Sequence, residues 1–141
     1  MRFTKLVTVA LATAALAASV ATADPGKGKG KPTCKPAPVM LAGTLANDPT
    51  TGDTSFELTV KHANRLGRLY AKAGNPVTVN VDTKTRYRKD GGSSTLDALA
   101  QNDQALVFAK VCRADVKAAV GSNSTLPDMT ARAVLDSGEA E

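Results

Sequence analysis

One short stretch of the sequence places basic residues at a spacing that could hold a polyanion. Lys84, Arg86 and Arg88 alternate with Thr and Tyr in the segment TKTRYRKDG. Alternate residues of a strand project from one face about 7 Å apart, so these three cations would form a ladder for successive phosphates or sulfates. Arg65 and Arg68 are candidates to extend this ladder. The alternative is a solvated strand face whose cations discourage pairing with another strand edge.

Aromatic residues bear on the choice between these two interpretations. Proteins that bind single-stranded nucleic acid stack bases on aromatic side chains, each worth roughly 1–3 kcal/mol. After the first 23 residues this chain has only two Phe and two Tyr. Strand alternation predicts that Phe56 and Tyr87 face inward. We therefore favour the solvated face, and keep binding of a nucleic acid or an acidic wall polymer as the alternative.

The residue types needed for catalysis or metal binding are scarce. His62 is the only histidine, so a Ser-His-Asp arrangement would have to use it, and the sequence has no Gly-x-Ser-x-Gly elbow. One histidine and two cysteines supply too few ligands for a zinc site. Asp48 and Asp53 lack the spacing of an EF-hand calcium loop. We expect no enzymatic activity, no metal and no cofactor.

The first 23 residues have the features of an export signal. Arg2 and Lys5 precede an apolar stretch, and the small residues Ala21, Thr22 and Ala23 form a cleavage site. The apolar stretch is shorter than the roughly 20 residues that a membrane-spanning helix needs. We expect cleavage near Ala23, no membrane span, and a secreted, periplasmic or cell-envelope protein.

The remaining chain is predicted to form one domain between two tails. Residues 24–38 are rich in Gly, Lys and Pro and predict a flexible tail. Residues 39–137 suit a single β domain, and residues 138–141 a C-terminal tail. The whole chain has a net charge of +5, yet from Pro36 onward it has twelve basic and twelve acidic residues. The positive excess therefore belongs to the N-terminal segments, and we expect the domain to be a monomer.

From residue 39 onward, apolar residues recur with the period of two that is typical of strands half buried in a sheet. Ser94 is predicted to cap one short helix between the third and fourth strands. That order is typical of OB-type domains, so we predict a mainly β fold, a small OB-like antiparallel β-barrel. An open sheet or a sandwich are the alternatives. The expected strands cover residues 39–45, 56–61, 77–88, 105–114 and 129–135.

Cys34 and Cys112 are the only cysteines. In an oxidising compartment we expect them to pair, which would stabilise the fold by roughly 4–5 kcal/mol in the chain-entropy model. Two free thiols or an intermolecular bridge are the alternatives. The alternation predicts that Cys112 faces outward beside Leu106 and Phe108. The tail bearing Cys34 would then cross these two apolar residues, unless they form a partner surface.

Seven short motifs are spread over residues 39–135. They are Gly43-Thr44-Leu45, Phe56-Glu57-Leu58-Thr59-Val60, Ala63-Asn64-Arg65-Leu66-Gly67-Arg68, Val77-Thr78-Val79, Thr85-Arg86-Tyr87, Leu96-Asp97-Ala98-Leu99 and Asn102-Asp103-Gln104-Ala105. Together they resemble a known family, domain of unknown function 5666, which comprises small secreted bacterial domains. The resemblance implies a compact β-barrel, with no established activity or site residues. The chain departs from the family at Asn102-Asp103, where Gly-Asp is usual.

These observations predict an exported, non-enzymatic β-barrel that acts as a binding or structural module at the cell envelope or outside the cell. Its alternative function is polyanion binding through the basic strand face and the tail, with an acidic polymer or a cell-envelope component as partner. Lys27, Lys29 and Lys31 would be the cations of the tail. Binding of this kind should weaken as salt rises, because fewer counterions are released favourably.

Overall fold

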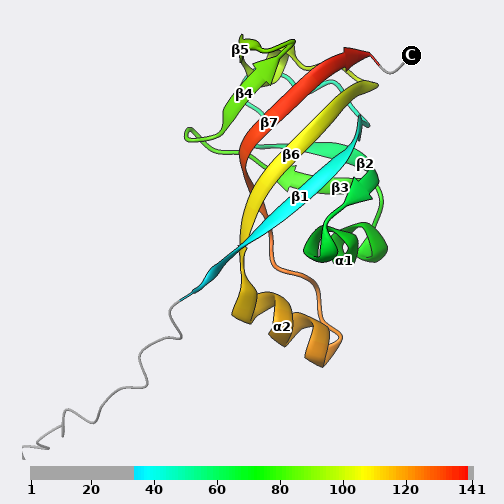
Figure 1. Cartoon of the computed structure of the whole chain (residues 1–141), viewed down its shortest axis with the longest axis vertical. Coiled ribbons are helices and arrows are strands. Elements are labelled where there is room, and N and C mark those ends of the chain that lie inside the picture. The colour runs from blue at the N-terminus through cyan, green and yellow to red at the C-terminus, as the bar shows by residue number, and fades with distance from the viewer. Residues whose placement is uncertain (1–33, 140–141) are drawn as a thin grey trace, which may run out of the picture. The chain divides into compact units, whose positions relative to one another are not determined.

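The computed structural model describes residues 34–139 and shows a mainly β fold (Figure 1). The predicted export signal, most of the predicted N-terminal tail and the last two residues lie outside this range. Within the range, no helix has the length and apolar character needed to cross a membrane. The strands are β1 (Pro36–Leu45), β2 (Ser55–Ala63), β3 (Val77–Asn80), β4 (Arg86–Lys89), β5 (Gly92–Ser94), β6 (Asp103–Cys112) and β7 (Thr130–Glu139); the helices are α1 (Arg65–Ala73), the 3₁₀ helix η1 (Leu96–Ala98) and α2 (Arg113–Ser122).

The seven strands form one sheet in the order β3-β2-β1-β6-β7-β4-β5. Its centre is antiparallel: β1 pairs with β2 and β6, and β6 pairs with β7. β4 instead runs parallel to β7. A parallel bridge between Asn80 and Thr130 also joins β3 to β7. The long strands β1, β6 and β7 therefore lie side by side across the molecule (Figure 1).

The predicted period of two is confirmed in the long strands. On β1, Val39, Leu41 and Leu45 are buried, whereas Pro38 and Met40 are exposed. β2, β3 and β6 alternate in the same way, whereas a bulge between Ala131 and Ala133 interrupts the alternation of β7. Together these strands build one continuous core under the sheet. The buried apolar residues of those strands are Phe56, Leu58, Val77, Val79, Ala105, Val107, Ala109, Val111, Ala131 and Val134.

β1 begins at Pro36, inside the segment that was predicted to be a tail. β6 pairs with β1 from Pro36 onward, whereas β2 pairs with it only from Leu41. The first half of β1 therefore has an open edge, where a proline without an N–H group removes no ladder hydrogen bond. Pro36 and Pro38 are compatible with a strand for this reason.

The prediction that Ser94 caps a helix is wrong. Ser94 is paired with Tyr87 at the end of β5, and its backbone is therefore committed to the sheet. The following segment forms only the three-residue η1, and Leu99 returns to an extended conformation. Two longer helices lie elsewhere, α1 directly after β2 and α2 directly after β6.

α1 begins at Asn64, whose side-chain oxygen accepts a hydrogen bond of 2.8 Å from the N–H of Gly67. This is the geometry of an N-cap. Gly67 lies against β1, where a Cβ atom would stand 2.7 Å from Leu41 Cδ2 and 2.7 Å from the Met40 carbonyl oxygen. A glycine inside α1 thus allows the helix to pack close to β1.

Candidate anion-binding face

The predicted cations Arg86 and Arg88 lie on the side of the sheet opposite the core. β4 is paired with β7, so Arg86 stands beside Ala133 and Arg88 beside Leu135. The register continues across β6 and β1, because Ala133 pairs with Phe108 and Leu135 with Leu106. Two cross-strand rows result, Arg86–Ala133–Phe108–Met40 and Arg88–Leu135–Leu106–Ala42. We call the surface formed by these eight residues the outer face.

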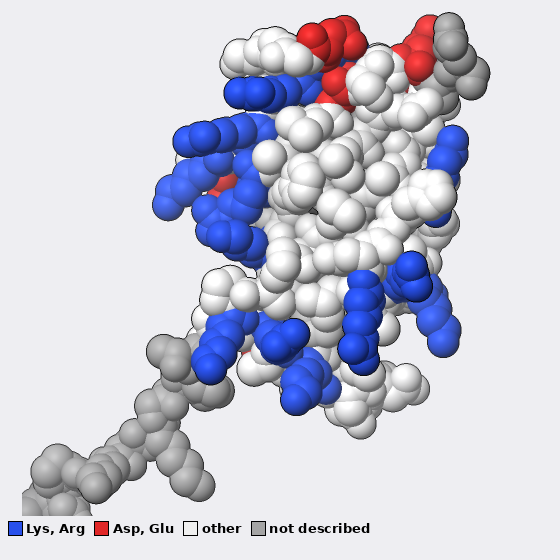
Figure 2. All heavy atoms as spheres, in the orientation of Figure 1, with Lys and Arg blue, Asp and Glu red and all other residues white. Residues whose placement is uncertain are grey.

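The centre of the outer face is apolar and open to solvent. Met40 is 39% exposed, Phe108 38% and Leu135 36%. Figure 2 shows the same arrangement as a broad uncharged area over β1, β6 and β7 with basic side chains on either side of it. Large apolar residues exposed next to one another are a feature of binding surfaces.

The two arginines at the positive edge of the outer face form no ion pair with the acids of the described residues. Arg86 and Arg88 are exposed, and the ion pairs found within residues 34–139 involve only Lys89. Lys110 adds a cation at the far end of β6, and Arg132 adds one on β7. Along the described length of β1, β4 and β6, no outward position carries a carboxylate.

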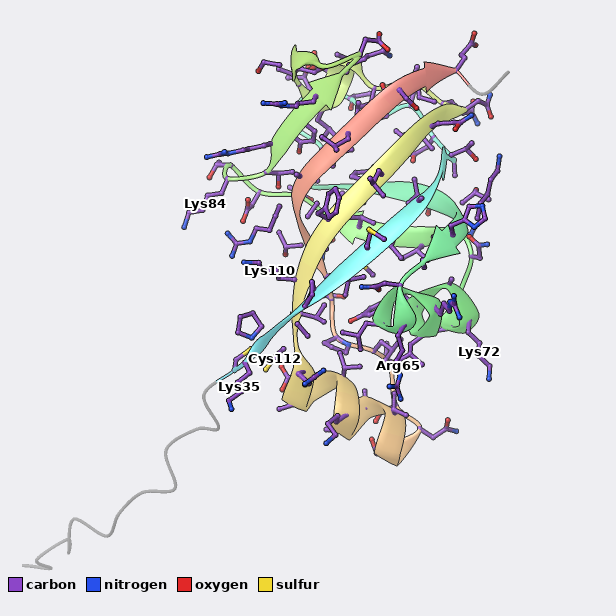
Figure 3. All side chains as sticks on the ribbon, viewed as in Figure 1. Lys35, Arg65, Lys72, Lys84, Lys110 and Cys112 are labelled. Carbon is purple, nitrogen blue, oxygen red and sulfur yellow. The ribbon has the colours of Figure 1, made fainter. Side chains whose placement is uncertain are left out.

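Lys84 does not belong to the same strand as Arg86 and Arg88, so the predicted continuous strand over residues 77–88 is wrong. The Asp82 side chain accepts a 2.8 Å hydrogen bond from the Lys84 N–H, and the Thr85 hydroxyl accepts one of 3.0 Å from the Asp82 N–H. Aspartate favours such turns because its side chain binds nearby backbone N–H groups. Lys84 is exposed in this turn, which leads into β4 (Figure 3).

Arg65 and Arg68 are not brought to the ladder. Both lie on α1, which follows β2, and β2 is four places away from β4 in the sheet. Arg68 is exposed and donates a 3.2 Å hydrogen bond from Nε to the Ala63 carbonyl oxygen. The predicted set of five cations therefore divides into Lys84, Arg86 and Arg88 near β4 and two residues on α1.

Lys89 points the other way, into a buried acidic pair that the sequence analysis missed. Its Nζ lies 2.7 Å from Asp103 Oδ2 and 3.3 Å from Asp136 Oδ2, and it donates a 3.0 Å hydrogen bond to the Ala98 carbonyl oxygen. Asp103 is 2% exposed and Asp136 5%. In the sequence, the one feature that sets Lys89 apart from Lys84, Arg86 and Arg88 is its position at the end of the basic run.

The two carboxyl groups have opposite pKa shifts. Burial by itself raises the pKa of Asp103, but hydrogen bonds from Lys89 and the Ala100 N–H outweigh it and lower that pKa. Burial raises the pKa of Asp136, and the neighbouring Asp103 adds to this increase. Asp136 Oδ2 also has no hydrogen-bond partner. Lys89 therefore stabilises the ionised form of Asp103 more strongly than that of Asp136.

Cys34 and Cys112 are free thiols in this structure, and no disulfide joins them. They are close, because Pro36 is paired with Cys112 across β1 and β6. A hydrogen bond with Cys112 raises the pKa of the Cys34 thiol to about 11. The described part of the predicted tail does not cross Leu106 and Phe108, since β1 itself lies beside β6 and Lys35, just before β1, lies at the Cys112 end (Figure 3). The rest of the predicted tail lies outside the described residues.

The candidates for catalysis and metal binding remain isolated. His62 is exposed on β2, opposite Ala42, at a shallow depression that Lys61 and Gln104 also line. Within residues 34–139, no three His, Cys, Asp or Glu side chains are grouped in a way that could hold a metal ion. No family model matches this chain, and neither a curated protein nor a solved structure matches it.

Proposed function

We propose that this protein is an exported, non-enzymatic binding module whose outer face holds an anionic polymer. The observation that carries the proposal is the register that aligns Arg86 with the exposed Phe108 and Arg88 with the exposed Leu135. A solvated strand face needs cations but has no need of a large apolar area beside them. We further propose that the sheet closes as a small OB-like barrel, which the bridge between Asn80 and Thr130 supports.

Single-stranded nucleic acid is the polyanion that suits such a surface best. Its phosphates would lie along Arg86 and Arg88, while a base would stack on Phe108, since every base has an aromatic face. An acidic wall polymer would use the same cations but has no base to stack. The contribution of Phe108 to binding therefore separates the two ligands.

A salt titration of binding tests this proposal. The ligands are a labelled single-stranded oligonucleotide and a poly(glycerol phosphate) of similar charge, and the measurement is fluorescence anisotropy with the full chain. Changing Arg86 and Arg88 together to Ser should lower the slope of log affinity against log salt by about 1.4 for the oligonucleotide, because two phosphate contacts are lost. Phe108→Ser should cost the oligonucleotide about 1–3 kcal/mol and leave the poly(glycerol phosphate) unaffected.

The matched control removes the same charge from another surface. Arg68 and Lys72 are exposed on α1, away from β4 in the sheet order, and are changed together to Ser. For this control variant, the slope of log affinity against log salt should be the same as for the unchanged protein. Equal losses in the two double variants would show that any surface charge serves, and the proposal would then be wrong.

We also propose that Cys34 and Cys112 form a disulfide once the protein is exported. The two thiols are not at disulfide distance in this structure, but Cys34 lies two residues before Pro36, which pairs with Cys112. The two thiols would give up two protons and two electrons to a disulfide oxidant, which becomes a dithiol. Thiol titration of exported protein, denatured without reductant, is expected to find no free thiol. Two titratable thiols per chain would contradict this prediction.

A further inference from the structure

A second surface, separate from the outer face, has the composition of a site for a small amphiphile. Its floor is apolar and comes from both helices: Leu66 and Leu69 of α1, and Val116 and Val120 of α2. Val116 is part of the core, whereas Val120 is 55% exposed, the largest exposure among the big apolar residues of the described chain. The helices thus leave apolar side chains open between them.

The space between these side chains is large enough for a ligand. The groove has a volume of about 730 Å3, and Ala37 and Pro38 at the start of β1 complete its lining. Binding sites for small molecules measure about 300–1,000 Å3 and are mostly apolar with a few polar groups. The groove fits this description in both size and composition.

The charged residues at the groove are all basic. Arg65 comes from α1, and Arg113 and Lys117 come from α2, while none of the described residues that line the groove is acidic. In Figure 3, Arg65 lies between the two helices, whereas Lys72 lies at the other end of α1, and it is not among the residues that line the groove. An apolar floor below three cations is complementary to a molecule with an aliphatic chain and an anionic head.

We propose that this groove binds a single-chain amphiphile with a carboxylate head, of the fatty-acid class. Each methylene group removed from water contributes about 0.8 kcal/mol, and the carboxylate would pair with Arg65, Arg113 or Lys117. Charge argues against two other occupants. Lys27, Lys29 and Lys31 of the N-terminal segment have the same sign as these cations, and so does the groove of a second copy.

The direct test uses dodecanoate below its micelle concentration as the probe, titrated into the full chain in a calorimeter. Val120→Glu is expected to raise the dissociation constant about tenfold or more, because it removes apolar contact and adds repulsion. Val120 is exposed, so this change should leave the fold intact. Changing Arg65 and Lys117 together to Glu should weaken binding to a similar extent. Lys72→Glu, two turns further along α1 and outside the groove lining, should bind as the unchanged protein does.

Two related probes separate the parts of the proposal. Dodecyltrimethylammonium has the same chain with a cationic head, and acetate has the head without the chain; both are expected to bind at least about tenfold more weakly than dodecanoate. Equal binding of the cationic probe would overturn the proposal. So would binding confined to anionic phospholipid vesicles, because the groove would then serve a membrane surface. The Arg86 and Arg88 double variant should bind dodecanoate normally, which makes this result independent of the outer face.

Discussion

Replacing Lys89 with Met is expected to lower the free energy of unfolding by about 3–5 kcal/mol near pH 7, because it leaves buried carboxyl groups without their only cation. Lys89 Nζ lies 2.7 Å from Asp103 Oδ2 and 3.3 Å from Asp136 Oδ2, and both aspartates are almost inaccessible to solvent. Methionine keeps most of the apolar stem. Urea unfolding of the two proteins measures the difference.

The loss of unfolding free energy in Lys89→Met should depend on pH, and the two pKa shifts determine the direction of this dependence. The pKa of Asp103 is lowered in the folded state, so its ion pair stabilises the fold above the ordinary carboxyl pKa and stops doing so as pH falls through the lowered value. The pKa of Asp136 is raised, so its protonated form stabilises the fold in acid, and this contribution disappears as pH rises through the raised value. The deficit of Lys89→Met should therefore shrink as pH falls below the ordinary carboxyl pKa of about 4 and through the lowered pKa of Asp103, where the ion pair with Lys89 is lost.

Two further variants identify the cause of the loss. Asp136→Asn added to Lys89→Met removes one of the two uncompensated acids and should restore part of the stability. Lys84→Met removes a lysine from the exposed turn before β4 and should change stability by less than about 0.5 kcal/mol. A deficit of Lys89→Met that does not shrink as pH falls below about 4 would show that the acidic pair is not its source.

The alternation of the long strands could be predicted from the sequence because it depends only on neighbouring residues. Val39, Leu41 and Leu45 recur at the period of two, and β1 buries them as expected. The outer face could not be predicted in the same way. It requires Arg86 to stand beside Ala133, and this pairing joins residues far apart in the chain. A basic ladder and an exposed Phe108 were each visible, but their common register was not.

The two α-helices were missed for local reasons that the structure explains. Asn64, Leu66 and Leu69 have the spacing of a capped helix, but Gly67 inside it lowers helix propensity by about 1 kcal/mol relative to Ala. Its role is the close approach of α1 to β1, which is a tertiary effect. α2 begins directly after Cys112, and no side chain caps it. A helix without a start signal is hard to distinguish from the end of a strand.

The acidic pair also could not be predicted, because Lys89, Asp103 and Asp136 belong to three different strands. The basic run suggested that Lys89 was one more solvated cation. Its inward direction follows from the pairing of β4 with β7, where Lys89 stands beside Asp136. Exposed Arg88 and half-buried Lys89 are neighbours in the chain. Because successive residues of a strand face opposite sides of the sheet, one points to solvent and the other to the acidic pair.

Gly43→Ala is expected to have the other large effect on stability, a loss on the order of 3 kcal/mol, at the upper end of overpacking costs. A Cβ atom at this position would lie 2.0 Å from the Thr59 carbonyl oxygen and 3.0 Å from Val60 Cα. Both are backbone atoms of β2, so no side-chain rotation can relieve the contact. Urea unfolding measures the loss.

Gly74 provides the matched control, since a Cβ atom there would meet nothing within 4 Å and its backbone is extended at φ −174°. Gly74→Ala should change stability by less than about 0.5 kcal/mol. Equal effects of the two changes would contradict the close approach of β1 and β2.

The register of β1 against β2 shifts between Ala42 and Gly43, and Ala42 belongs to the outer face. Gly43→Ala should therefore also weaken oligonucleotide binding, because β1 can accept the methyl group only by moving relative to β2 and β6.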